Sequence, residues 1–523
     1  MIGFLKRFLG NRRGNVAIIF SLSLLPLAVL TGGVVDFSAA MNARTRLAQA
    51  LDAAALAVGV DPNITNAEAV DLANDFIAAN YPDNEIGTVQ NIAISINDDA
   101  DTITVNGDAR VRTAMLGLIG IDHITVSWES EVQRARQRLE LVMVLDNTGS
   151  MRGSKISSLR DSAELLTEIL FDAAEDADDV KIGLVPFAAT VNVGTQFARD
   201  WWLDPDGRSP QHAEWAGGVS QEIEVETCTG RRRRRTCTTT TETVSFNHWD
   251  LYDMMRYESW NGCVESRSIP FDIDNTAPSN GSPATLFVPY FAPDEPDDDR
   301  DYRNDYLSDG SLLDLGSNLL NRLLNVEKYD NATVQDDYGP NMRCTTTPIT
   351  PLTNSESDIL DAIDDMRASG TTNIPQGVGW GIRVISPEVP FTEGTDWSND
   401  EVVKAMVILT DGENVMYGRS TDLRSDYGAY GYSRDGRLGT TSSSSSTLGR
   451  QLDNRLEAAC DEAKDLGIRV YTITFQVSDS GTRDLMRECA SHPSLYFDSP
   501  SASALEDAFE MIAGDLTNLR LSR

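Results

Sequence analysis

The stretch Leu141-Val-Met-Val-Leu-Asp146-Asn147-Thr148-Gly149-Ser150-Met151 decides the fold of this chain. Its apolar first half, which contains β-branched residues, predicts a buried strand of a parallel sheet. The turn that follows then lies at the carboxyl end of that strand, where open α/β sheets place their ligands. Asp146, Thr148 and Ser150 alternate along the turn, so their oxygen atoms can face one point. Oxygen ligands of this kind suit Mg²⁺ or Ca²⁺ rather than zinc.

Two later segments carry similar features. Ala405-Met-Val-Ile-Leu-Thr-Asp411 is a second apolar run that ends in an acid, and Ser369-Gly-Thr-Thr372-Asn is a polar loop before a helix-like stretch. Together the three segments resemble the von Willebrand factor A domain, whose metal-ion-dependent adhesion site (MIDAS) combines one residue cluster from each. The resemblance implies a Rossmann-like α/β fold. It also implies that Mg²⁺, Ca²⁺ or Mn²⁺ binds to five residues: Asp146, Thr148, Ser150, Thr372 and Asp411.

The resemblance has one departure and one ambiguity. Thr148 stands where the family usually has serine, which keeps the hydroxyl group. Thr371 and Thr372 both fit the second loop, and Thr372 has the family's distance to the following helix. The alternative interpretation is that the strand-end acids and hydroxyls only cap turns and helices.

The family's metal site implies adhesion rather than catalysis, because the carboxylate of a protein partner completes the coordination of the ion. We therefore expect a binding protein, with no catalytic residues. A metal-assisted hydrolase is the alternative from another class, but the chain shows no G-x-S-x-G elbow near these loops and no P-loop. Its four histidines lie outside the motif segments.

Length and charge narrow the class of protein further. A chain of 523 residues is long enough for two or three domains. Its 44 basic and 80 acidic residues give a formal charge of −36. Such a chain repels phosphates, so we expect no nucleic-acid partner.

The amino terminus predicts a membrane anchor. Residues 1–15 form a basic tail, and residues 16–35 carry no charge. A helix of that length spans roughly the 30 Å hydrocarbon core of a bilayer. Basic residues before the span place the amino end in the cytoplasm. The alternative is a cleaved signal peptide, and Gly14-Asn15 is also similar to a prepilin cleavage site.

The same region resembles a family. Arg13-Gly-Asn-Val-Ala-Ile-Ile-Phe20, the apolar span, and Asp36-Phe37 within an Ala-rich helix are similar to the TadE/TadG group of tight-adherence (Flp) pilus-assembly proteins. A carboxyl-terminal A domain makes the chain TadG-like. The resemblance implies an inner-membrane-anchored protein of the bacterial envelope, with its bulk in the periplasm, that assists pilus assembly or anchoring. A surface adhesin that binds host or matrix ligands is the rival interpretation.

Periodicity divides the rest of the chain. Residues 36–60 predict a helical stalk, which either packs on its own domain or meets a partner helix. Residues 61–135 predict a small α+β domain with a helix at Asn66–Asn80, which Asn66 is placed to cap, and strands near 91–96, 102–112 and 124–132. Residues 139–523 form the A-like domain, interrupted by an insertion at about 196–350. The loop 415–449 leaves the same sheet edge as Asp411 and is placed to rim the metal site.

Cysteines and charge runs complete the sequence-based expectations. An exported protein with an even number of cysteines favours disulfides, although six cysteines allow many pairings. We expect the pairs Cys228–Cys237, Cys460–Cys489 and, by elimination, Cys263–Cys344. The run Arg231, Arg232, Arg233, Arg234 and Arg235 at a hairpin tip is either a partner contact or a solvated loop. The acidic run at 294–305 does not fit an EF-hand, and we expect it to be a solvated loop.

Overall fold

The computed structural model describes most of the chain. It describes residues 13–59, 64–82, 86–97, 102–133, 137–218, 220–229, 236–296, 304–307, 323–334, 338–344 and 347–521. These residues divide into two compact units, of which the first comprises residues up to 136 together with the last few residues and the second comprises 137–517. The α/β class expected from the sequence is confirmed.

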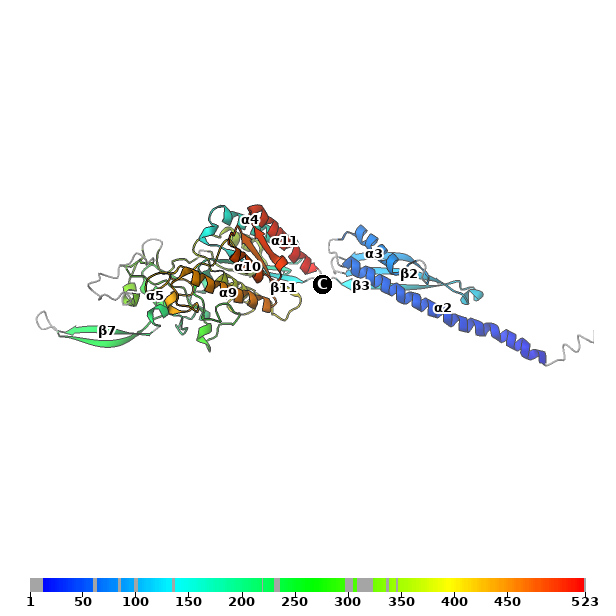
Figure 1. Cartoon of the computed structure of the whole chain (residues 1–523). Helices are drawn as coiled ribbons and strands as arrows, with labels where there is room; N and C mark the ends of the chain where they lie inside the picture. The colour runs from blue at the N-terminus through cyan, green and yellow to red at the C-terminus, as the bar shows by residue number, and fades with distance from the viewer. Residues whose placement is uncertain are drawn as a thin grey trace, which may run out of the picture. The chain divides into compact units, whose positions relative to one another are not determined.

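The first unit is a three-stranded antiparallel sheet covered by helices on one face (Figure 1). Its strands are β1 (Thr88–Asn97), β2 (Thr102–Arg112) and β3 (His123–Gln133), in that order across the sheet. Alternate residues of β2 are buried, as expected for a sheet with one covered face. The covering helices are α2 (Arg13–Gly59) and α3 (Asn66–Asn80).

The carboxyl-terminal half of α2 belongs to the core of this unit. Ala43, Leu47, Ala50 and Ala54 are fully buried in one cluster with residues of α3 and β2. The predicted cap of α3 was wrong by one residue. Thr65 is the cap, and it forms a capping box with Glu68, in which each side chain accepts the backbone N–H of the other residue.

The amino-terminal half of α2 exposes large apolar side chains. The exposed residues between the helix start and the packed half include Ile19, Phe20, Leu22, Leu24, Leu27, Leu30, Val34, Val35 and Phe37. The predicted membrane span 16–35 forms part of this helix, and the side chains at 16–18, 25, 28 and 29 lie outside the described set. Within the described part of the chain, no helix is both long and apolar enough to cross a membrane.

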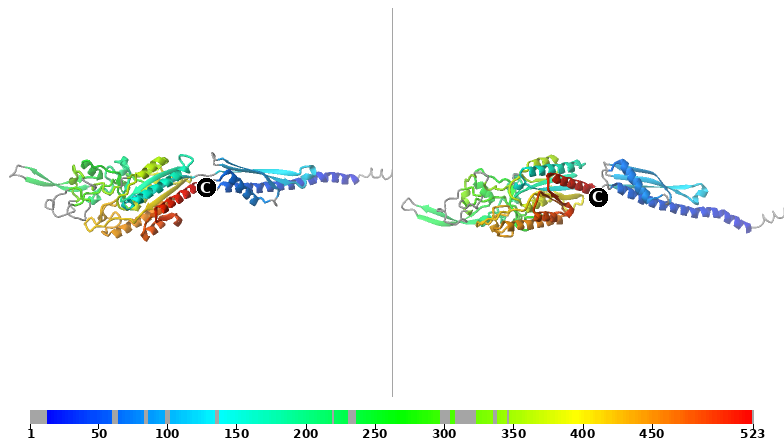
Figure 2. Two further views of the ribbon diagram at one scale, coloured as in Figure 1. Left: turned by 90° about the horizontal axis from the view of Figure 1, so that it is seen from above. Right: turned by 45° about the horizontal axis from the view of Figure 1, so that its top comes forward.

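The second unit, of which Figure 2 gives two further views, is built on an eight-stranded mixed sheet. Its strand order is β13-β12-β11-β4-β5-β6-β9, and β10 also pairs with β5. The five strands from β13 to β5 run parallel to one another, and the others are antiparallel additions. The strands are β4 (Arg138–Asp146), β5 (Val180–Phe187), β6 (Val191–Asn192), β9 (Cys263–Val264), β10 (Thr350–Thr353), β11 (Val402–Thr410), β12 (Arg469–Phe475) and β13 (Tyr496–Ser499).

Among the described residues, six helices outside the insertion belong to this unit. They are α4 (Ser154–Asp172), α7 (Glu356–Asp364), α8 (Ile374–Ile385), α9 (Ser445–Asp465), α10 (Ser480–Cys489) and α11 (Ala502–Leu521). Val142 and Val144 of β4 share one core cluster with residues of α8, α9 and α10. The central strand β4 is buried almost throughout, as its unbroken apolar run predicts.

Two glycines let α8 lie directly against the sheet. A Cβ atom at Gly377 would lie 2.7 Å from the Phe187 ring and 3.0 Å from Val144, and one at Gly381 would lie 2.7 Å from Val144. These positions are one helical turn apart and therefore face the sheet together. The close approach fixes the start of α8, and with it the loop that carries Thr372.

The insertion shares the core of the second unit. It contains the hairpin β7 (Ser220–Thr229) and β8 (Thr236–Ser245) and the helix α5 (His248–Met254). Its strand β9 joins the main sheet, and its aromatic residues Trp215, Trp260 and Phe287 belong to the same core cluster as Val144 of β4. The irregular sequence of this region therefore folds as part of the second unit.

The expectation that residues 294–305 form a solvated acidic loop was wrong for its first two acids. Asp294 and Glu295 are buried. Asp294 accepts hydrogen bonds from the backbone of Tyr306 and Leu307 and pairs with Lys328 at 2.8 Å. Burial of these carboxylates is compatible with stability because each one is hydrogen-bonded. Residues 297–303 lie outside the described residues.

The tight α8 contact yields a prediction. Gly377→Ala should lower the free energy of unfolding by about 1–3 kcal/mol, because the added methyl group must displace the Phe187 ring or Val144. Gly514→Ala is the matched control, since a Cβ atom on this α11 glycine would meet nothing within 4 Å. The control should be neutral or stabilising by up to ~1 kcal/mol. Urea unfolding measures both, and equal stability of the two variants would contradict the packing argument.

Candidate metal centre

The loop after β4 places Asp146 in a buried, hydrogen-bonded position. Asp146 is fully buried, and its Oδ1 accepts the backbone N–H of Thr148 at 2.8 Å. Its Oδ2 accepts the hydroxyl of Thr410 at 2.8 Å and the backbone N–H of Asp411 at 3.4 Å. These bonds join the carboxyl ends of β4 and β11, which are neighbours in the sheet. The acids expected from two distant segments therefore lie side by side.

Ser150 links the two halves of the centre. Its Oγ lies 2.9 Å from the Thr148 Oγ1 and donates to the Asp411 Oδ1 at 2.6 Å. The second carboxylate oxygen of Asp411 accepts from the Lys155 Nζ at 2.7 Å. Asp146, Thr148, Ser150 and Asp411 are thus brought together, and an ammonium group already occupies one side of the cluster.

Thr372 lies in the loop that packs on the first one. The Ser369 N–H donates to the Asn147 carbonyl at 2.7 Å, and the Gly149 N–H donates to the Gly370 carbonyl at 3.0 Å. Thr372 is buried, and its carbonyl accepts from the Val415 N–H at 2.8 Å. The backbone contacts hold this loop against the Asp146 loop. No hydrogen bond of the Thr372 hydroxyl to either acid is found among the described residues.

The electrostatics of the cluster favour a further positive charge. Burial, and then the charge of the neighbouring Asp411, together raise the pKa of Asp146 to about 6. Hydrogen bonds from Thr148 and Thr410 oppose the shift only in part. Lys155 is partly exposed and pairs with Asp411, and Asp146 has no cationic partner in the described part of the chain.

The donor set fits a divalent cation. It offers two carboxylates and at least two hydroxyls at one sheet edge, which matches the oxygen preference of Mg²⁺. Three or more His, Cys, Asp or Glu side chains do not cluster as metal ligands anywhere in the described ranges, so hydroxyls would have to contribute. The buried amide of Asn147 has no partner for its nitrogen or its oxygen among the described residues, which fits ordered water around an ion.

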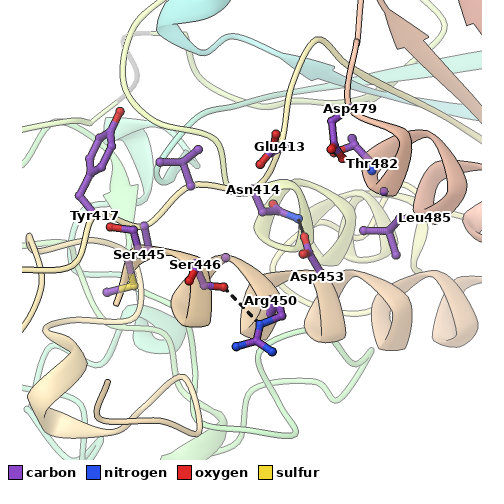
Figure 3. Close-up of a pocket in the computed structure, with 14 residues that line it drawn as sticks. Glu413, Asn414, Tyr417, Ser445, Ser446, Arg450, Asp453, Asp479, Thr482 and Leu485 are labelled. Carbon is purple, nitrogen blue, oxygen red and sulfur yellow. Dashed lines mark hydrogen bonds between the residues drawn. The ribbon is translucent and has the colours of Figure 1, made fainter. Parts of the chain in front are cut away.

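A cavity of about 540 Å³ lies along the segment that begins two residues after Asp411 (Figure 3). It is lined by residues that follow Asp411 and by the first turns of α9 and α10. Asn414 forms its inner wall, where it accepts from the Ile374 N–H at 2.9 Å and donates to Asp453 at 3.0 Å. The rim carries Glu413, Tyr417 and Arg450. The two ends of the loop 415–449 therefore line this cavity, and its role as the rim of a metal site stays a prediction.

Buried ion pairs fix this loop to the insertion. Asp426 pairs with Arg343 of the insertion and with Arg419 of its own loop. Arg437 is buried between Glu214, at 2.8 Å, and Glu265, at 2.6 Å. Charge pairs that cross between segments in this way give a defined geometry, because an unpaired buried charge is costly. The surroundings of the centre are thus built jointly from two regions distant in sequence.

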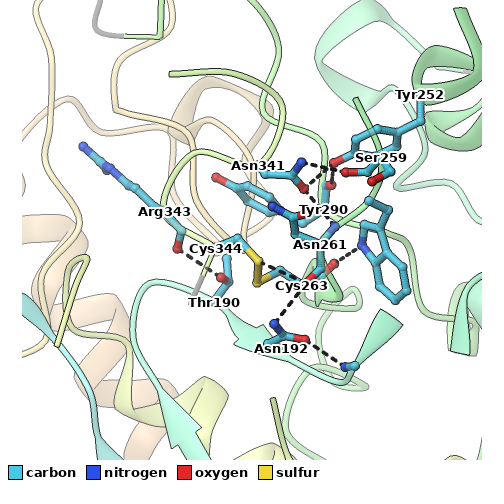
Figure 4. The surroundings of a disulfide bond; sticks show 12 residues. Thr190, Asn192, Tyr252, Ser259, Asn261, Cys263, Tyr290, Asn341, Arg343 and Cys344 are labelled. Atoms are coloured by element: carbon cyan, nitrogen blue, oxygen red, sulfur yellow. Dashed lines mark hydrogen bonds between the residues drawn. A yellow bond between two sulfur atoms is a disulfide. The ribbon is translucent and has the colours of Figure 1, made fainter. Parts of the chain in front are cut away.

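The disulfide Cys263–Cys344 closes the insertion beside β6 (Figure 4). Its Cα atoms are 5.6 Å apart. Asn341 binds the chain around it by accepting from the Tyr252 hydroxyl and the Asn261 N–H. The pair Cys460–Cys489, with Cα atoms 5.1 Å apart, joins α9 to α10. Both predicted disulfides are confirmed.

Two other sequence predictions fall outside the described side chains. Residue 228 stands directly opposite residue 237 in the β7–β8 ladder, and the sulfur atoms of Cys228 and Cys237 are not among the described atoms. Residues 231–235, the arginine run, lie outside the described residues. Both remain predictions.

Sequence reasoning missed two residues of the centre. Thr410 was treated as part of a strand, although its hydroxyl binds Asp146. Lys155 is absent from the predicted ligand set, although it binds Asp411. Lys155 stands in the first turn of α4, which begins at the same sheet edge as the Asp146 loop. The feature of the sequence that could have indicated this role is a basic residue a few positions after the loop that carries Asp146.

The amino-terminal segment matches a known family. Residues 14–61 match the model described as "Putative Flp pilus-assembly TadE/G-like". The resemblance expected from the sequence is confirmed for this segment, which comprises most of α2. No protein with a curated description matches the chain.

Solved structures of low identity align with much of the chain. The pilus adhesin SpaC from Lactobacillus rhamnosus GG, in its open conformation, has 13% identity and a TM-score of 0.31, with 84% of this chain and 34% of SpaC covered. The vWF domain of the type V pili tip protein Mfa5 from Porphyromonas gingivalis has 10% identity and a TM-score of 0.33, with 74% and 97% covered. This chain thus spans about a third of SpaC. Similarities at these values imply nothing about function.

The raised pKa of Asp146 yields a pH prediction for the metal-free protein. A carboxyl whose pKa rises from ~3.9 unfolded to about 6 folded stabilises the fold only while protonated. Its contribution, on the order of 2–3 kcal/mol, is therefore present below pH ~4 and lost as the pH rises to ~6. Urea unfolding in EDTA should show this loss in the native protein and not in Asp146→Asn. Parallel pH profiles of the two proteins would contradict it.

Proposed function

We propose that this protein is a cell-envelope protein that binds a protein partner through a divalent cation, in the assembly or anchoring of Flp-type pili. The cation would be held by Asp146, Thr148, Ser150 and Asp411, with Thr372 from the adjoining loop. Mg²⁺ is the first candidate, and Ca²⁺ or Mn²⁺ would suit the same oxygen atoms. The partner would contribute an exposed carboxylate.

One observation carries the proposal. Ser150 bridges the Thr148 hydroxyl and the Asp411 carboxylate beside the fully buried Asp146. Two acids and two hydroxyls thus converge at the carboxyl edge of a parallel sheet, where open α/β sheets place ligands. A structural role alone does not explain why Asp146 is left without a cation while its pKa is raised by burial and by Asp411.

The residues around a bound ion would have different roles. A bound ion would supply an electrophilic centre for a carboxylate ligand. Thr410 and the Thr148 N–H orient Asp146, and Ser150 orients Asp411. Lys155 would hold Asp411 when no ion is bound, since it neutralises one of the two acids. The Lys155 ammonium would therefore compete with a metal ion for Asp411, and a bound ion would have to displace it or share the carboxylate with it.

The cavity beside Asp411 would provide specificity. Its rim combines acidic, aromatic and basic side chains from Glu413, Tyr417 and Arg450. Buried ion pairs between the loop and the insertion keep this rim in place. The centre would thus supply a generic carboxylate contact, and the surrounding loops would select the partner.

The location in the envelope rests on the first unit. The family match over residues 14–61 supports a role in Flp pilus assembly. The exposed aliphatic residues of α2, the uncharged stretch 16–35 and the basic tail support an anchor in the inner membrane. We propose that the amino end is cytoplasmic and that the second unit lies in the periplasm.

The test is site-directed photo-crosslinking in native envelopes. A photoreactive residue at position 417 replaces Tyr417, whose side chain is 47% exposed at the rim of the cavity. We expect an adduct with a protein partner in Mg²⁺ that falls roughly tenfold or more, equivalent to ~1.4 kcal/mol, in EDTA or in Asp411→Ala.

A matched variant controls for charge. Asp422→Asn removes an exposed acid from the same loop, outside the centre, and should crosslink like the parent protein. An adduct that persists unchanged in EDTA and in Asp411→Ala would overturn the metal-dependent function. An adduct found only with host or matrix material would replace the pilus role with that of an adhesin.

A further inference from the structure

The loop between β2 and β3 carries an apolar tip. Its residues Ala114-Met-Leu-Gly-Leu-Ile-Gly-Ile121 contain no charge. Leu118 is 73% exposed, Ile119 53% and Ile121 45%. Contiguous exposed aliphatic side chains of this kind mark an interaction site, because their exposure to water is unfavourable.

The tip is a defined structure. The Thr113 N–H donates to the Asp122 carbonyl at 3.0 Å and closes the loop at its base. Within it, the short helix η2 (Leu116–Ile119) ends at Gly120, whose positive φ of 91° turns the chain back. The Ile121 N–H returns to the Leu116 carbonyl at 3.1 Å. The exposed side chains are therefore presented by a closed, hydrogen-bonded turn.

Asp36 attaches this tip to α2. Its carboxylate accepts the backbone N–H groups of Ala114, Met115 and Leu116 at 2.8–2.9 Å. Gly32 leaves room for the attachment, since a Cβ atom there would lie 2.2 Å from the Met115 side chain. The tip thus lies beside residues 32–36 of α2, and Figure 1 shows this end of the sheet next to the helix.

The attachment point coincides with the end of the uncharged stretch of α2. Residues 16–35 carry no charge, and Asp36 is the first acid. Val34, Val35 and Phe37 are exposed at the level of the tip. Charged residues flank the apolar loop, with Arg112 at the end of β2 and Asp122 directly before β3. The apolar surfaces of helix and loop therefore end together.

We propose that the 114–121 loop inserts into the lipid surface beside α2, as a second apolar contact of the first unit with the bilayer. The inference rests on the proposed anchoring of α2. Three features favour lipid over a protein surface. The uncharged stretch of α2 matches the hydrocarbon thickness of roughly 30 Å. The amino-terminal side of this stretch carries basic residues, which suit anionic headgroups. Asp36, at the other end of the stretch, is fully hydrogen-bonded, and an unpaired charge at the edge of the hydrocarbon would be costly.

An inserted loop would restrict the orientation of the first unit at the membrane. A single helix leaves its domain free to rotate and tilt at the membrane. A loop clamped to residues 32–36 by Asp36 adds a second point of contact, which would fix the depth and tilt of the first unit.

The test measures depth in the membrane with the full chain reconstituted in vesicles of phosphatidylethanolamine and phosphatidylglycerol. Cysteine replaces Leu118, Leu22 or Ser95, one at a time, and carries an environment-sensitive fluorophore. Ser95 is exposed on β1 near the opposite end of the sheet and serves as the control. The parent protein reports background labelling, since the four described cysteines are all in disulfides.

We expect lipid-borne nitroxide to quench the Leu118 probe several-fold more than the Ser95 probe, and iodide to do the reverse. A Leu118 probe open to iodide beside a lipid-quenched Leu22 probe would overturn this inference and leave the anchor intact. If both probes are open to iodide, the anchor itself fails. A Leu118 probe shielded from iodide but not quenched by lipid would place a protein, such as a second copy, on the tip and overturn the lipid assignment.

Discussion

The second unit depends on two carboxylates held side by side at the end of a buried sheet. Asp146 is the last residue of β4 and Asp411 directly follows β11, so the pairing of these neighbouring parallel strands brings the two acids together. Two like charges in a buried place repel each other, and the structure offsets this with hydroxyls, backbone N–H groups and one lysine. Asp146 receives hydrogen bonds but no positive charge from the described residues, and a divalent ion would supply that charge.

Much of the surrounding architecture serves to keep this cluster in place. The glycines of α8 let that helix lie against β4 and β5, which sets the loop before it against the Asp146 turn. The insertion and the 415–449 loop are joined by buried pairs such as Arg437–Glu265, and a disulfide ties the insertion near β6. The insertion and the 415–449 loop, which show little periodicity in sequence, thus hold each other in a defined arrangement.

The sequence predicts the elements whose signal is local. The buried run of β4, the alternation of β2 and the acids at strand ends are properties of short windows, and the structure has these elements at the expected places. The missed features depend on tertiary contacts. Asp294 and Glu295 are buried by partners far along the chain, β9 is a two-residue strand, and Lys155 gains its role only where α4 begins beside Asp411.

The position of a bound ion decides whether the two buried acids form a cation site. Crystals of the protein grown or soaked in Mn²⁺ would reveal the ion by anomalous scattering. We predict a peak among the side-chain oxygens of Thr148, Ser150 and Asp411, with the Lys155 ammonium moved away from the Asp411 carboxylate. A fully occupied Lys155–Asp411 pair in saturating Mn²⁺, with no peak between Asp146 and Asp411, would contradict it.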